Sequence, residues 1–310
     1  MENGIYDEID IQAYHENREI VSSTGLKHAK KSTRDFVWYV IHGTEKRLTF
    51  DFGNAFELAL MDKINGTNDF DNAVAVMQTM QWTQEALSQK PDLVNPKASK
   101  VYKQLSNKFI QKNASKYLIP DVGMESEEHL KHMVYSCIAN NTIRQLLSGT
   151  TYQKSLVWTD PDVGIKCKTR PDICMVKKNV ILDIKTTINA SPKGFAKQVA
   201  NLDYPLQAVI QCQGAMHTGL MEKVDHYFWL AIEKHAPFNV ALYELPKEEL
   251  EYFTDEYLYI LKRCAKGLNQ ISSYKQESDI YNFASYGEQS ENKHGILELQ
   301  IPLWYKNELI

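Results

Sequence analysis

The stretch GIKCKTRPDICMVKKNVILDIKTT, residues 164–187, decides the fold of this chain. It contains two apolar runs, ICMV at 173–176 and VILDI at 180–184, separated by the polar bend KKN. Polar residues with Asn at the bend are typical of a turn, and the flanking runs are typical of strands. The stretch therefore predicts a β-hairpin, and its second run has the character of a buried central strand.

Three charged residues interrupt the apolar pattern of this hairpin: Asp172, Asp183 and Lys185. Because side chains in a strand alternate between faces, Asp183 and Lys185 are expected on one surface and Ile184 on the other. Pairing of the two strands would bring Asp172 close to Asp183. Converging carboxylates repel each other unless a proton or a cation lies between them, and hard oxygen ligands suit Mg²⁺ or Mn²⁺. Lys185 would place a positive charge where a phosphoryl transition state builds negative charge.

The Asp-x-Lys tripeptide by itself is a weak signal, because on a surface strand it is usually a solvated charge pair. In VILDIK, however, the charges lie in an apolar run that is expected to be buried. Burying a charge in such a strand costs on the order of several kcal/mol unless the charge is paired or serves a chemical function. The context therefore favours a metal-dependent nuclease site.

The chain resembles PD-(D/E)xK nucleases, and more narrowly the exonuclease VIII type of phage and prophage recombination exonucleases. The segments that carry the likeness are VWTDPDVGIKCKTRPDI, VILDIKTTINASPKGFAKQVANLDYPLQA and FELALMD around Glu57. Fainter matches lie in IDIQAYHENREIVSSTGLKHAKKS near the start and in ILELQIPLW near the end. The resemblance is most specific between residues 155 and 215.

The resemblance implies the site residues. Asp172, Asp183 and Glu57, with the carbonyl of Ile184, would hold Mg²⁺ or Mn²⁺, and Glu57 takes the place of a histidine that relatives usually offer from the same helix. Asp172, Asp183, Lys185 and Gln207 would form the catalytic set, with Gln207 positioning substrate or water. The position of Glu57 on an apolar helical stripe with Leu60 and Met61 agrees with a carboxylate that has a partner.

Three positions depart from the family pattern. Gln153 stands where many relatives carry an acidic residue, which puts affinity for a second metal in doubt. Pro205 and Gln211 stand where relatives usually show a histidine and an aromatic residue.

The order of expected elements implies an α/β (α+β) fold, with a central mixed sheet flanked by helices as in restriction endonucleases. We expect one domain over residues 1–310: a helical part at 1–150 that contributes Glu57, a catalytic core at about 150–268, and a tail at 269–310. Helices are expected after Ser22, from about Gly53, within 66–150, from Ser191, from Tyr204 and after Pro246. Strands are expected at 155–158, 226–233, 238–245 and 296–304.

Composition sets further limits. With 310 residues and 43% hydrophobic content, the chain can bury a substantial core. It shows neither a run of about 18 apolar residues nor a signal peptide, so we expect a cytoplasmic protein. Its five cysteines include no Cys-x-x-Cys pair, which argues against zinc and disulfides and favours buried core thiols.

The net charge of −4 requires that any DNA contacts be concentrated on local basic surfaces. Lys27, Lys30 and Lys31 form one candidate patch, although they could equally be a solvated face. We expect DNA contacts at Lys168, Arg170, Lys193 and Lys197.

The resemblance implies an exodeoxyribonuclease that degrades one strand of linear double-stranded DNA, 5′→3′, for phage-type recombination. Implied partners are double-stranded DNA ends, a single-strand annealing recombinase and further copies of the chain in a ring-shaped tetramer. Two alternatives stay open: an endonuclease of the same superfamily, and a catalytically idle DNA-binding or assembly subunit, suggested by Gln153 and Pro205. A glycoside or nucleotide hydrolase is disfavoured, because paired-carboxylate glycosidases need no neighbouring lysine.

Overall fold

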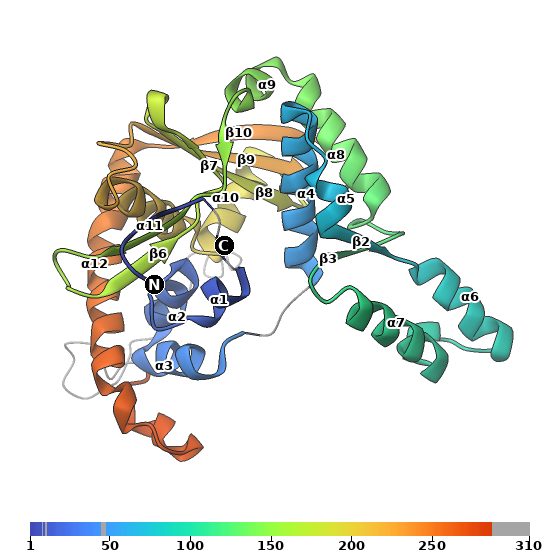
Figure 1. Cartoon of the computed structure of the whole chain (residues 1–310), viewed down its shortest axis with the longest axis horizontal. Helices are drawn as coiled ribbons and strands as arrows, with labels where there is room; N and C mark the ends of the chain where they lie inside the picture. Colours follow the sequence, from blue (N-terminus) through green and yellow to red (C-terminus); the bar gives the residue numbers. More distant parts are fainter. Residues whose placement is uncertain (8, 10, 45–47, 287–310) are drawn as a thin grey trace, which may run out of the picture.

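The computed structural model describes residues 1–7, 9, 11–44 and 48–286 (Figure 1). At its centre lies a five-stranded mixed sheet in the order β10-β9-β8-β7-β4. β8 pairs in parallel with β9, and the other neighbours are antiparallel. The strands of this sheet are β4 (Thr151–Tyr152), β7 (Ile173–Met175), β8 (Val180–Thr187), β9 (His226–Glu233) and β10 (Val240–Leu245). The predicted α/β class with a central mixed sheet is confirmed.

β7 and β8 form the hairpin that the sequence predicts. Ile173 lies opposite Leu182, and Met175 lies opposite Val180. A short 3-10 turn, η2 (Val176–Lys178), leads to Asn179, whose φ of 54° is left-handed. Asn tolerates this conformation better than most residues, so it closes the bend. β8 is the middle strand of the sheet, as its apolar run indicates.

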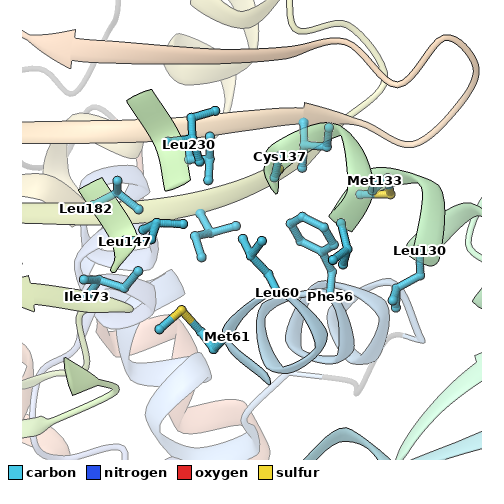
Figure 2. Close-up of a cluster of buried hydrophobic side chains, with 14 of the residues drawn as sticks. Phe56, Leu60, Met61, Leu130, Met133, Cys137, Leu147, Ile173, Leu182 and Leu230 are labelled. Carbon is cyan, nitrogen blue, oxygen red and sulfur yellow. The ribbon is translucent and has the colours of Figure 1, made fainter. Parts of the chain in front are cut away.

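One face of the sheet packs against three helices, α4 (Leu48–Asn65), α8 (Glu127–Ala139) and α9 (Asn141–Leu147). Figure 2 shows Phe56, Leu60 and Met61 of α4 directed toward strand residues such as Leu182 and Leu230. The N-terminal helix that carries Glu57 therefore shares its core with the sheet. This helix begins at Leu48, about one turn earlier than its predicted start.

The other face packs against α10 (Pro192–Asn201) and α11 (Tyr204–His217). The Ser191 hydroxyl accepts the N–H of Gly194, and Pro192 occupies the first helical turn, so α10 begins as its sequence predicts. Similarly, Ser22 caps the predicted helix α2 (Ser23–Lys31). Behind α11 lies a second core formed with α2, α3 (Thr33–His42) and α12 (Lys247–Gln270).

A smaller antiparallel sheet, β1-β5-β6, lies beside α11. Its strands are β1 (Gly4–Tyr6), β5 (Ser155–Thr159) and β6 (Lys166–Thr169). Gly214 allows the close approach of α11, because a Cβ there would lie 2.6 Å from Thr169 Cγ2 and 2.8 Å from Trp158 Cζ3. A larger residue at this position would push the helix away from the sheet that leads to Asp172.

The region 66–150 contains the expected helices and also two parallel strands that the sequence analysis missed. β2 (Val74–Met77) and β3 (Tyr117–Pro120) are short and carry no clear alternation, so their sequences do not distinguish them from helix or loop. Between them run α6 (Thr79–Gln89), η1 (Pro96–Ala98) and α7 (Lys100–Lys112). Figure 1 shows α6 and α7 projecting from the body beyond α4.

The remaining described elements are α1 (Ile11–Glu16), α5 (Asp69–Ala73), η3 (Ile271–Ser273) and η4 (Glu277–Asn282). The predicted strand at 238–245 begins instead at Val240, because Phe238 takes a left-handed φ of 58°. The edge strand predicted at 296–304 lies outside the described residues. Within the described chain, no helix is both long and apolar enough to cross a membrane. All five cysteines are buried, as expected for core thiols.

Candidate active site

Asp172 lies immediately before β7, at the point where the hairpin pairing ends. The backbone N–H of Ile184 donates to Asp172 Oδ2 at 2.7 Å, continuing the ladder with a side chain instead of a strand. The N–H and C=O of one strand residue point to the same side of the strand. The carbonyl of Ile184 therefore faces the same gap as Asp172, which agrees with its predicted role as a ligand.

Asp183 is fully buried in the middle of β8. Its Oδ1 accepts two hydrogen bonds from α11, from Gln207 Nε2 at 2.9 Å and from Gln211 Nε2 at 3.2 Å. Its Oδ2 forms an ion pair with the ammonium of Lys185 but has no hydrogen bond of good geometry among the described residues. The carboxylate is thus held in place on one oxygen while the other keeps lone pairs for a further partner.

Lys185 projects from the same face as Asp183, as the alternation along β8 predicts. Burial disfavours its charged form, but the negative charges of Asp183 and Asp172 outweigh burial and raise the Lys185 pKa above its ordinary value. The ammonium lies 4.9 Å from the centre of the Tyr204 ring. Lys185 is therefore a fixed cation whose position is set by a carboxylate and an aromatic face.

Lys27 approaches the same ring from α2, with its ammonium 5.3 Å from the ring centre. Burial, and then repulsion from Lys185, lower the Lys27 pKa to about 8. The predicted basic patch of α2 thus contributes one lysine to the site. Lys30, by contrast, pairs with Asp203 and Glu256.

Glu57 enters from α4 and is nearly buried, as its place on the apolar stripe predicts. Its Oε2 accepts a hydrogen bond from Gln153 Nε2 at 3.0 Å, and Gln153 Oε1 accepts one from Arg170 at 2.7 Å. The Gln153 N–H also donates to the carbonyl of Asp172 at 2.9 Å. Gln153, one of the residues that depart from the family pattern, therefore connects Glu57 to Asp172.

The three carboxylates repel one another electrostatically. Burial, and then the charges of Glu57 and Asp183, raise the pKa of Asp172 well above its usual range, while Lys185 and the Ile184 N–H oppose the shift. A cation near Asp172 would relieve this repulsion. Among the residues that the structure describes, no three His, Cys, Asp or Glu side chains converge as a ready metal cage.

Mg²⁺ usually binds proteins through one or two carboxylates, with waters and substrate phosphates completing its shell. Asp172, Asp183 Oδ2 and the Ile184 carbonyl offer only hard oxygen donors, which fits this pattern. The participation of Glu57 stays a prediction, since its Oε2 already accepts from Gln153.

The four residues predicted to contact DNA differ in their exposure. Lys168 is only 2% exposed, and its ammonium donates to the backbone carbonyls of Tyr14 and Asn17. Its assignment as a DNA contact is therefore corrected: the N-terminal segment covers this face of β6, and Lys168 ties the two together. Arg170 is partly buried on Gln153, whereas Lys193 and Lys197 are exposed on α10 and remain candidate contacts.

The sequence analysis missed the roles of Gln211, Tyr204 and Tyr227. Gln211 follows Gln207 by one helical turn and bonds the same carboxylate oxygen, and it accepts the hydroxyl of buried Tyr227 at 2.7 Å. The i, i+4 spacing of the two glutamines was the available signal. Nothing in the local sequence indicates that Tyr204 lies beside Lys185 or that Tyr227 lies beside Gln211.

Comparison with protein families finds a match over the part of the chain that forms most of this site. The sequence model of a family described as "PDDEXK-like domain of unknown function (DUF3799)" matches residues 93–276, which include Gln153, Asp172, Asp183, Lys185 and Gln207. None of the curated proteins matches the chain. A crystal structure described as "Putative exonuclease" from Eubacterium rectale is similar with a TM-score of 0.45 and 13% sequence identity, covering 97% of this chain and 98% of that chain.

Proposed function

Because the chain belongs to the PDDEXK-like family DUF3799, we propose that it is a metal-dependent exodeoxyribonuclease that degrades one strand of linear double-stranded DNA. The observation that carries the proposal is the buried Asp183–Lys185 pair on the central strand, with the carboxylate of Asp172 beside it. Charges placed in a core at this cost are expected to serve chemistry.

Each residue has a task in phosphodiester hydrolysis. Asp172 and Asp183, with the Ile184 carbonyl and Glu57, would hold Mg²⁺ or Mn²⁺. When bound, the ion would lower the pKa of a water molecule and offset charge on the phosphate. Lys185, kept protonated by Asp183, would orient the nucleophile or stabilise negative charge in the transition state. Gln207 and Gln211 hold Oδ1 of Asp183, which leaves Oδ2 beside Lys185 with lone pairs for a cation.

The direction 5′→3′, the requirement for a DNA end and a role in phage-type recombination rest on the resemblance to exonuclease VIII-type enzymes. The same resemblance supports a ring-shaped homotetramer and a single-strand annealing recombinase as partner. These features concern assembly and substrate entry, whereas the residues described above concern cleavage.

The test is digestion of end-labelled linear, nicked and closed circular duplex in Mg²⁺, Mn²⁺ or EDTA. We expect linear duplex to lose nucleotides progressively with either metal, circles to survive in the same tube, and EDTA to stop the reaction. Rapid linearisation of circles by homogeneous protein would favour the endonuclease alternative. A lack of cleavage together with a lack of metal binding would favour the idle subunit.

A further inference from the structure

We propose that the helical arm formed by residues 78–116 is a lysine-bearing surface that holds duplex DNA beyond the active site. The inference rests on the proposed function, since it assumes that the substrate is duplex DNA. It concerns a part of the chain that supplies none of the candidate catalytic residues.

The arm differs in charge from the rest of the chain. It contains seven lysines against two acidic residues, Glu85 and Asp92, a net charge of +5 in a chain whose net charge is −4. Six of these lysines are exposed: Lys90, Lys97, Lys100, Lys103, Lys108 and Lys112. Among the described residues, none of the arm lysines pairs with a carboxylate, whereas lysines elsewhere such as Lys30 and Lys234 do. Uncompensated positive charge of this kind attracts a polyanion.

The arm is a folded unit and not a loose basic segment. Trp82 of α6 packs edge-on against Tyr102 and Phe109 of α7, with ring centres 5.7 and 5.5 Å apart. At 3.6 residues per turn, Lys100, Lys103 and Lys108 lie outside the stripe that Tyr102 and Phe109 turn inward. The lysines are therefore displayed on the outer surface of a packed helix pair.

The base of the arm is fixed to the helix that enters the site. The N–H of Leu118, on β3, donates to the buried carboxylate of Asp51 on α4 at 3.1 Å. Asp51 precedes Glu57 by six residues, or about 9 Å along the helix. At the other root, Asp121 accepts the N–H groups of Thr79 and Met80 and caps α6. A substrate at the site therefore lies near the origin of the arm.

The character of the surface favours duplex over single-stranded DNA. Single-strand paths usually offer exposed aromatic rings on which bases stack. The three aromatic residues of the arm, Trp82, Tyr102 and Phe109, all pack inward. Lysines without neighbouring aromatic rings can bind the phosphates of a duplex, and such contacts do not depend on the base sequence. The 13 residues of α7 span about 20 Å, roughly six base pairs.

The test measures binding without cleavage. The arm variant K100Q/K103Q/K108Q/K112Q is compared with the control variant K177Q/K178Q/K262Q/K266Q, which removes the same charge from exposed lysines elsewhere. Affinity for a labelled duplex of about 30 base pairs is measured by anisotropy in EDTA over a range of salt. The arm variant should bind about tenfold or more weakly, and its log–log salt slope should fall by about 2 to 4, since each lost phosphate contact removes about 0.9. The control should match the wild type.

Two results would overturn the inference: an unchanged affinity and slope for the arm variant, or an equal loss in both variants. Circular dichroism checks folding, and K100Q/K103Q serves if the fourfold change does not fold. Because no cleavage is involved, a protein that binds through the arm yet fails to digest DNA would refute the proposed function and leave the arm intact.

Discussion

Replacement of Asp172 by Asn is expected to stabilise the metal-free protein at neutral pH. In the wild type, burial and the charges of Glu57 and Asp183 penalise the ionised carboxyl. Asn has nearly the same shape, and its amide oxygen can still accept the N–H of Ile184, which is 2.7 Å from the wild-type carboxyl. The change removes the charge and keeps the contact, so we expect a gain of about 0.5–2 kcal/mol in the free energy of unfolding.

The gain should depend on pH in a definite direction. The pKa of Asp172 in the folded protein is raised above the ordinary 3.8. The folded protein therefore binds this proton more tightly, and the resulting stability is fully present below the unfolded pKa and lost as pH rises through the folded pKa. Asn does not titrate. The variant and the wild type should thus differ least at acid pH, and the advantage of the variant should grow toward neutral pH.

Divalent metal should reverse the order of stability of the wild type and the Asp172→Asn variant. A ligand at about 100 times its Kd adds about 2.7 kcal/mol to the stability of the form that binds it. Mg²⁺ should therefore stabilise the wild type and have little effect on Asp172→Asn. The assay is urea unfolding followed by circular dichroism at several pH values, in EDTA and in Mg²⁺. A variant that is less stable than the wild type in EDTA at neutral pH, or that responds equally to Mg²⁺, would refute the reasoning.

Three further predictions concern residues around Asp172 and Asp183. Lys185→Gln should lower the rate of DNA cleavage by about 10²-fold or more, the usual loss for a transition-state partner; single-turnover kinetics measures it, and near-normal activity would remove Lys185 from the site. Glu57→Gln should weaken Mg²⁺ binding measured by calorimetry and raise the Mg²⁺ concentration needed for cleavage; an unchanged titration would make Glu57 a structural residue. Gln211→Leu leaves the buried Tyr227 hydroxyl without its acceptor and should cost about 1–3 kcal/mol in unfolding free energy. Tyr227→Phe should offset part of that loss in a double-mutant cycle, and strictly additive effects would contradict the coupling.

Much of the core was readable from local sequence because strand and helix periodicities are local properties. The hairpin was predicted from the KKN bend and the buried run around Asp183, and it is present. α10 was predicted from the Ser191-Pro192 helix start and is present too. β2 and β3 were missed because strands of four residues carry too little pattern, and their pairing joins segments more than 40 positions apart. The prediction that Lys168 contacts DNA was wrong for a similar reason: alternation along β6 does not reveal which face the N-terminal segment covers.

The sequence by itself determined which groups are available for chemistry: two aspartates and a lysine at hairpin spacing, and a glutamate on an apolar helical stripe. These follow from alternation and helical periodicity, which act within a few residues. Only the tertiary structure decided which distant groups surround them. Gln207 and Gln211 reach Asp183 because α11 packs across β8, and Gln153 reaches Glu57 because β4 lies beside β7. The base of the arm is fixed to α4 because Asp51 accepts the N–H of Leu118 on β3. Such contacts depend on the packing of whole elements, and no local pattern encodes them.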